Sequence, residues 1–261
     1  DSNTGALSSL TLDGKELLAA PITLSLFRPA TDNDNRDRNG ARLWRKAGLN
    51  NLTQKVVSLK EEKTSATVRA EILNGKGQKV GMADFVYALD KNGALKVRTT
   101  QPDTAIVKSM ARLGLTFRMA DAYNQVSYLG RGDHETYIDR NQSGRIGLYD
   151  TTVERMFHYY ATPQSTANRT DVRWAKLTDQ AGEGVFMESN RPFQFSIIPF
   201  SDVLLEKAHH INELERDGMI TIHLDAEQAG VGTATCGPGV LPQYLVPVKK
   251  QSFEFTLYPV K

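Results

Sequence analysis

The sequence predicts an all-β protein, organised as one large antiparallel β-sandwich with a few short helices. Segments that alternate apolar and polar residues recur along most of the chain, and turn-forming residues separate them at short, fairly regular spacing. Helical signals are confined to two short stretches. A length of 261 residues suits one large all-β domain or two ordinary ones. No linker-like tract divides the chain, so we predict a single domain over residues 1–261.

The strand predictions follow from alternation and from short apolar runs. Thr64–Leu73 shows the pattern well, with apolar residues at every second position, and the Asn-Gly step within Asp90–Gly93 predicts a hairpin turn between two such runs. In chain order, the predicted strands are Ala6–Leu12, Pro21–Phe27, Gln54–Lys60, Thr64–Leu73, Val80–Leu89, Ala94–Thr100, Leu113–Arg118, Gln125–Leu129, Gly184–Glu188, Phe193–Ile198, Met219–Leu224 and Ser252–Tyr258.

Two short helices are predicted. Asn39–Gly48 contains Leu43 and Trp44 and ends at a glycine, which is typical of a helix C-terminus. Ser201 precedes Asp202 and is suited to cap a brief helix over Val203–Ala208.

Composition excludes several classes of partner and site. The net charge is +2 with both signs interspersed, which gives no electrostatic case for nucleic acid or a membrane surface. No apolar run is long enough to predict a membrane span. Cys236 is the single cysteine, so an internal disulfide and the common zinc patterns are ruled out.

Tyr128–Arg140 is the most informative stretch of the sequence. Gly130 and Gly132 predict a tight turn or a close backbone approach. Beyond them, Glu135, Tyr137 and Asp139 alternate, so in a strand they would share one face, away from His134. Such a face is not a core face, and it is either a polar site or an exposed strand edge.

Two other stretches are rich in possible ligands. Thr31–Asp37 carries several oxygen-bearing side chains, but its spacing fails the calcium-loop pattern, which favours a turn held by Asp and Asn. The five histidines show no metal-binding spacing, so no metal site is predicted. Gly230–Gly239 is a glycine-rich loop that contains Cys236, and it suits either a functional loop or an ordinary long connection.

Five segments, in the same order, resemble the C-terminal (small-chain, domain 5 type) domain of β-galactosidases of the LacZ type, in glycoside hydrolase family 2. Tyr128–Arg140 is similar to the Trp/Tyr-Leu-Gly-x-Gly-x-x-Glu-x-Tyr-x-Asp-Arg segment of that family. The others are Gly5–Leu10 with Asp13–Leu18, Phe27–Asp34, Pro163–Trp174, and Leu224–Gly232. The resemblance spans nearly the whole chain.

The resemblance implies a fold and a role. The fold would be a supersandwich of the galactose mutarotase-like type, packed beside the barrel that holds the catalytic pair. Retaining hydrolysis of a terminal β-D-galactoside needs two carboxylates roughly 5 Å apart, and in the family both come from the barrel. The chain would therefore hold no catalytic residue, be inert alone, and buttress the barrel of a larger bacterial enzyme in the cytoplasm or periplasm.

The resemblance also implies partners and site residues. The partners would be the rest of the polypeptide and, through it, the galactoside; no cofactor is expected here, whereas the parent uses Mg²⁺ and Na⁺ in other domains. A family loop tryptophan stacks on the sugar, and its position is Cys236, which we expect to line the sugar site on a solvent-facing, mobile loop. Ser165–Ala167 departs from a family Glu-x-Gly. Nine polar residues are expected to gather on one side, as an interface or polar site: Asp32, Asn33, Asp34, Glu135, Tyr137, Asp139, Arg140, Arg169 and Arg173.

Two alternatives remain open at this stage. A free-standing mutarotase or epimerase would need a general acid and a general base, for which Glu135 with His158 or His223 are candidates. A carbohydrate-binding module would need exposed aromatic residues, but Trp44 and Trp174 lie in apolar patterns that packing explains better.

Overall fold

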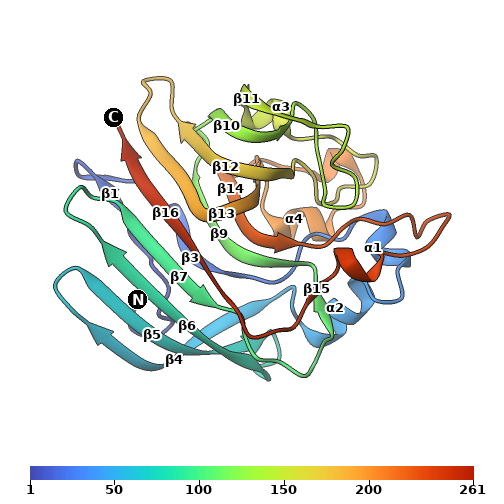
Figure 1. Cartoon of the computed structure of the whole chain (residues 1–261), viewed down its shortest axis with the longest axis horizontal. Coiled ribbons are helices and arrows are strands. Elements are labelled where there is room, and N and C mark those ends of the chain that lie inside the picture. The colour runs from blue at the N-terminus through green and yellow to red at the C-terminus, as the bar shows by residue number, and fades with distance from the viewer.

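The computed structural model describes residues 1–261 and confirms the all-β prediction, with 47% of residues in strands and 11% in helices. Its main feature is a twelve-stranded sheet in which all neighbouring strands are antiparallel (Figure 1). The long branch runs in the order β11 (Arg145–Thr152), β10 (Gln125–Gly132), β12 (Arg169–Thr178), β13 (Gly184–Ile198), β16 (Ser252–Val260), β7 (Leu95–Thr100), β6 (Lys79–Leu89), β5 (Ser65–Asn74) and β4 (Leu52–Glu61).

The second layer branches from the long strand β13. Gly184–Ser189 pairs with β16, whereas Gln194–Ile198 pairs with β14 (Met219–Gln228). β14 continues to β9 (Arg112–Ala120) and then to β3 (Ala20–Ser25). The two layers expected from the sequence are therefore branches of one folded sheet, and a cluster of 51 buried residues drawn from both branches forms the core.

The remaining elements are short. Two small sheets pair β1 (Thr11–Leu12) with β2 (Lys15–Glu16), and β8 (Ser109–Met110) with β15 (Val246–Pro247). The helices are α1 (Asp32–Arg36), α2 (Ala41–Ala47), α3 (Val153–Met156), α4 (Asp202–Lys207), η1 (Ile211–Glu213) and η2 (Pro242–Tyr244). No helix combines the length and the apolar character that crossing a membrane would require.

Both helix predictions and the hairpin are confirmed. α2 ends at Gly48, which adopts φ 74°, and Ser201 caps α4 by accepting a hydrogen bond from the backbone N–H of Leu204. The turn between β6 and β7 is held by Asp90 Oδ1, which accepts hydrogen bonds from the backbone N–H groups of Asn92 and Ala94.

Two strands of the main sheet were not predicted, and one was predicted in two pieces; the two-residue strands β2, β8 and β15 were also not predicted. β11 is an edge strand in which neither face is fully buried, and Leu148 is 71% exposed. Its sequence therefore lacks the pattern of a strand with one buried face. β12 contains register shifts around Asp171, which adopts φ 53°, and this irregularity interrupts the alternation. The predicted strands at 184–188 and 193–198 are the two ends of β13, which change partners at its middle.

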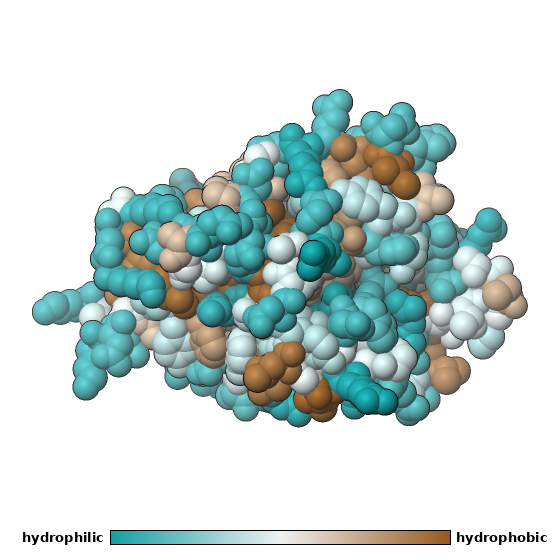
Figure 2. All heavy atoms as spheres, turned by 90° about the horizontal axis from the view of Figure 1, so that it is seen from above, coloured by the Kyte–Doolittle hydropathy of each residue, from teal (hydrophilic) through white to brown (hydrophobic).

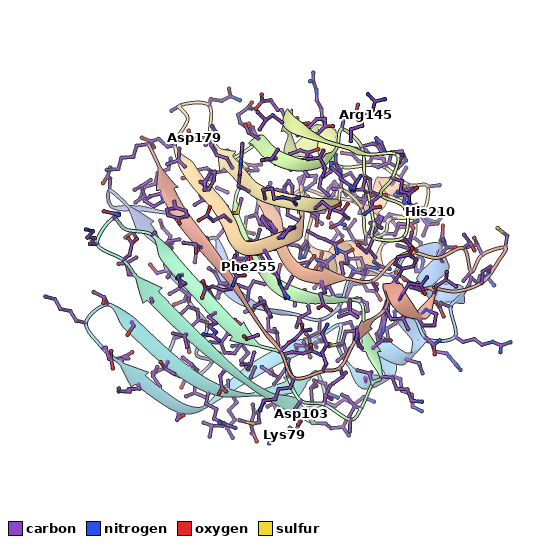
Figure 3. All side chains as sticks on the ribbon, in the orientation of Figure 1. Lys79, Asp103, Arg145, Asp179, His210 and Phe255 are labelled. Atoms are coloured by element: carbon purple, nitrogen blue, oxygen red, sulfur yellow. The ribbon has the colours of Figure 1, made fainter.

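Polar residues lie mainly at the surface and apolar residues in the interior, as the alternation along the strands requires. Figure 2 shows that hydrophilic residues cover most of one face, with apolar residues in small separate groups. In Figure 3, Phe255 lies within the sandwich, whereas Lys79, Arg145, Asp179 and His210 lie at its margins.

Candidate functional site

Four segments that are distant in sequence meet around one polar hollow of about 320 Å³. They are the start of α1, the turn that follows β10, the segment before β12, and the loop that follows β14. Five of the predicted site residues line it directly: Asp32, Asn33, Glu135, Tyr137 and Arg140. Thr31, Tyr160, Gln164, Ser165, Val231, Gly232 and Thr235 complete the lining.

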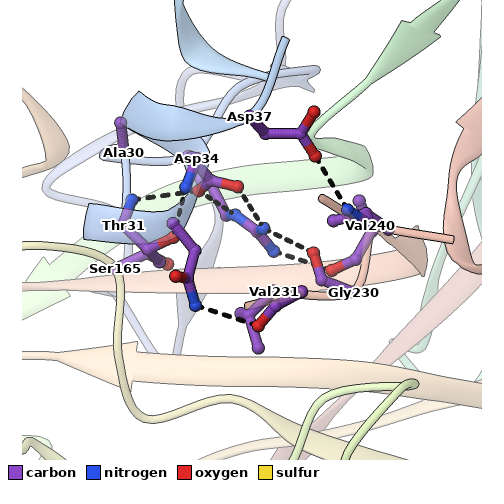
Figure 4. Close-up of polar contacts among 12 residues, drawn as sticks. Ala30, Thr31, Asp34, Asp37, Ser165, Gly230, Val231 and Val240 are labelled. Atoms are coloured by element: carbon purple, nitrogen blue, oxygen red, sulfur yellow. Dashed lines mark hydrogen bonds and ion pairs between the residues drawn. The ribbon is translucent and has the colours of Figure 1, made fainter. Parts of the chain in front are cut away.

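A buried ion pair involves Asp34, which follows the α1 residues Asp32 and Asn33 that line the hollow and is labelled in Figure 4. Arg28 donates to Asp34 through Nε (2.9 Å) and Nη2 (2.8 Å), and the two side chains are 0% and 1% exposed. Arg28 also donates to the carbonyl oxygens of Ala229 (2.7 Å) and Gly230 (2.8 Å). Burial opposes the charge of Arg28, but Asp34 more than offsets it and raises the pKa of the guanidinium. The pair thus joins α1 to the loop after β14.

Thr31–Asp37 is a short helix rather than the predicted turn. Thr31 Oγ1 accepts a hydrogen bond from the N–H of Asp34, and Asp34 Oδ2 accepts one from the N–H of Thr31, which is a reciprocal capping box. The carboxylate of Asp34 is therefore committed to the helix start and to Arg28. This explains why an acidic residue is buried there.

Glu135 ties together three parts of the hollow. Its Oε1 accepts hydrogen bonds from Arg140 (2.7 Å) and from the Tyr160 hydroxyl (2.9 Å), and its Oε2 accepts one from the N–H of Ala167 (2.8 Å). Burial, with the charge of Glu135 and its hydrogen bond, raises the pKa of Tyr160 to about 12. Ala167 adopts φ 68°, so the segment that departs from the family pattern reaches Glu135 through its backbone.

Glu135–Asp139 does not form the exposed strand edge that the sequence left open as an alternative, and Tyr137 is an exception to the expectation that this face lies outside the core. The segment is a turn closed by an isolated bridge between Tyr137 and Arg140. Tyr137 is 1% exposed, and the guanidinium groups of Arg28 and Arg140 each lie 5.5 Å from its ring centroid. A ring between packed segments and cations buries apolar area without a regular strand.

The remaining predicted site residues lie in different parts of the structure. Asp139 contacts the base of the loop after β14, where it accepts hydrogen bonds from backbone N–H groups, and Cys236 is exposed on that loop. Arg169 is buried outside the hollow and donates to the Tyr128 hydroxyl (3.0 Å). Arg173 is exposed and donates to the carbonyl of Asp171 (2.7 Å), so the structure does not bring it to this site.

The residues of the two alternatives do not assemble. His158 packs edge-to-face against Tyr160, whose hydroxyl already donates to Glu135, while His223 is buried and contacts Asp202 (3.1 Å). Trp44 is buried in the core. Trp174 is half-buried and stacks on Phe186, so packing explains both tryptophans.

Sequence reasoning missed several residues of the hollow. Gln164 accepts a hydrogen bond from the N–H of Asp32 (3.2 Å) and donates to its carboxylate (3.3 Å), across 132 positions of sequence. Tyr160, which also lines the hollow, was missed as well. Gln164 lies in a segment that carries the family resemblance, which could have identified it, whereas nothing in the local pattern marks Tyr160.

A larger cleft of about 610 Å³ lies elsewhere, between the N-terminal segment and the ends of β5, β6 and β16. Leu10, Leu12, Leu89 and Leu257 help to line it, and most of its lining is apolar. It contains none of the predicted site residues, so the polar hollow is the stronger candidate.

Comparison with known proteins gives a family match over residues 1–257, to the family described as beta galactosidase small chain. Among curated relatives, the β-galactosidase of Actinobacillus pleuropneumoniae is 24% identical over 98% of this chain and 25% of its own length. That of Kluyveromyces lactis is 28% identical over 98% of this chain and 26% of its own length. The chain thus spans about a quarter of the relatives it matches.

Solved structures give weaker likenesses. An aldose epimerase homologue from C. elegans is 11% identical over 99% of this chain and 80% of its own, with a TM-score of 0.43. A putative aldose 1-epimerase from Escherichia coli K12 is 11% identical over 100% of this chain and 81% of its own, also at 0.43. Likenesses at this level carry no argument about activity.

Proposed function

Because the chain belongs to the β-galactosidase small-chain family, we propose that it serves as the C-terminal domain of a larger enzyme that hydrolyses terminal β-D-galactosides. In this proposal the rim of the polar hollow, which consists of the lining residues of α1, of the turn after β10, of the segment before β12 and of the loop after β14, packs against the catalytic part of the parent polypeptide. The loop with Cys236 forms one wall of the galactose site, and the chain alone is inactive.

One observation carries the proposal. Four of the five segments that resemble the family, although far apart in sequence, converge on one hollow beneath the loop after β14. Segments that serve separate structural needs have no reason to share one surface. A common partner that covers this rim explains the convergence.

The chemistry of the hollow agrees with a supporting role. Retaining hydrolysis needs one carboxylate free to attack the sugar and another free to transfer a proton. Both oxygens of Glu135 accept hydrogen bonds, and Asp34 is committed to Arg28 and the capping box. These acids hold the site together, and the reacting pair is expected on the rest of the parent.

Complementation tests the proposal. The chain and the upstream part of its own parent are purified separately, and hydrolysis of an aryl β-galactoside is measured for each and for the mixture. Neither part should turn over the substrate alone, and mixing should restore activity. A chain whose residues 233–238 are replaced by an equal length of Gly and Ser is the control, which should associate but restore little activity. Turnover by the purified chain alone, or an inactive complex of the two unaltered parts, would contradict the proposal.

A further inference from the structure

The loop that carries Cys236 is fastened where it leaves β14. The carboxylate of Asp139 accepts hydrogen bonds from two successive backbone N–H groups, that of Val231 (3.1 Å) and that of Gly232 (2.8 Å). A Cβ atom at Gly230 would come within 3.0 Å of this carboxylate, so glycine leaves the room that the contact needs. Both oxygens of Asp139 are thus committed to the loop backbone.

The other end of the loop is held in the same way (Figure 4). Asp37 Oδ2 accepts a hydrogen bond from the N–H of Val240 (2.8 Å). A Cβ atom at Gly239 would lie 2.5 Å from this oxygen, so a second glycine makes room for a second carboxylate. Charge-assisted hydrogen bonds of this kind are stronger than neutral ones.

A third contact ties the loop between its ends. Asn33 donates to the carbonyl of Gly232 (2.9 Å) and accepts from both the N–H (3.0 Å) and the hydroxyl (2.8 Å) of Thr235. Asn33 lies on α1, next to Asp34, which the buried Arg28 fixes. The loop is therefore tied at three points to elements outside it.

We infer that Asp139, Asp37 and Asn33 are positioning residues that hold residues 233–238 in one conformation before any ligand arrives. The use of this ordering in binding a galactoside rests on the proposed function, whereas the ordering itself does not. The loop also closes on itself, since the N–H and the hydroxyl of Thr233 both donate to the Pro238 carbonyl and the N–H of Cys236 donates to the Thr233 carbonyl (3.0 Å). Ordering a loop costs conformational entropy. A loop that is already ordered in the folded protein does not lose that entropy when the substrate binds.

This inference revises the mobility expected from the sequence. Glycine density and exposure predict a mobile loop, and Cys236 is exposed as expected. The clamping residues, however, come from positions about 100 and 200 residues away, which the local sequence does not reveal. The loop thus forms a rigid rim rather than a lid.

Backbone ¹⁵N relaxation of the 261-residue chain tests the ordering directly. In the unaltered chain, order parameters at Thr233–Gly237 should approach about 0.85, the value of rigid backbone. Asp139→Ala and, separately, the milder Asn33→Ala should lower them to below about 0.6. Circular dichroism confirms that each variant is folded.

Asp90→Ala is the matched control. Asp90 also accepts two backbone N–H groups, in the turn between β6 and β7, so its loss should leave the order parameters of the Cys236 loop unchanged. Order parameters below about 0.6 in the unaltered chain would overturn the inference, and so would rigid loops in both clamp variants.

Kinetic measurements on the parent enzyme then test whether the ordered loop assists substrate binding. Asn33→Ala and Asp139→Asn should raise KM for a galactoside about tenfold with little change in kcat, because the loop contacts the sugar in ground and transition states alike. If relaxation shows a loosened loop but KM does not change, the clamp stands and the proposed place of the loop at the galactose site falls. If the loop stays rigid, the clamp itself fails, whatever the kinetics.

Discussion

At the scale of single residues, Arg28 joins α1 to the loop after β14 through five hydrogen bonds. A buried guanidinium is costly unless each donor finds an acceptor. Arg28 meets this condition with Asp34, Gln228 and two loop carbonyls, and its charge lies 6.0 Å from the ring of Trp44. The buried charge thus specifies how α1 and the loop after β14 fit together.

Arg28→Met should lower the free energy of unfolding by about 3–5 kcal/mol, because Asp34 would remain buried without its partner. Urea denaturation measures the loss. Arg69→Met is the control: Arg69 and Asp84 form an exposed ion pair at 3.9 Å, so this change should cost less than about 1 kcal/mol. Similar small losses in both variants would show that the buried pair contributes no more than a surface pair.

At the scale of elements, the sequence identified the strands of the main sheet in which one face is buried and the alternation of apolar and polar residues is unbroken. β5 and β6 alternate cleanly, and the Asn-Gly turn that ends β6 was predicted correctly. β11 and β12 were missed because exposure in one and a positive-φ Asp171 in the other break the alternation. Polar side chains alternate along Glu135–Asp139 although the segment is not a strand, because their positions are set by contacts with residues far along the chain.

The close pairing of β9 with β14 offers a test at this scale. Gly114 lies opposite Asp225, and a Cβ atom there would come within 3.0 Å of both the Leu224 carbonyl and the Asp225 carboxylate. Gly114→Ala should therefore destabilise the protein by about 1–3 kcal/mol through overpacking.

Thermal unfolding compares this variant with Gly147→Ala, on the edge strand β11. A Cβ atom at Gly147 would lie 3.3 Å from the Tyr149 side chain, which can shift, so this change should be nearly neutral. An unchanged midpoint for Gly114→Ala would mean that the two strands separate more easily than their contacts indicate.

At the scale of the whole molecule, the sandwich brings segments from four parts of the chain to one rim. The family resemblance marked most of these segments, but it could not show that Arg169 and Arg173 lie outside the hollow or that Tyr160 and Gln164 line it. Those placements depend on the β12 bulge and on the path of the chain between α3 and β12. The proposed function therefore requires that the parent polypeptide cover this rim.

Amide hydrogen exchange of the chain, alone and bound to the upstream part of its parent, tests that claim most directly. We expect slower exchange on binding in residues 31–35 and 231–240, and no change in the turn at residues 90–93, which lies away from the rim. Unchanged exchange around the hollow, with protection confined to the turn at 90–93 or to the apolar cleft near Leu10 and Leu12, would contradict the account.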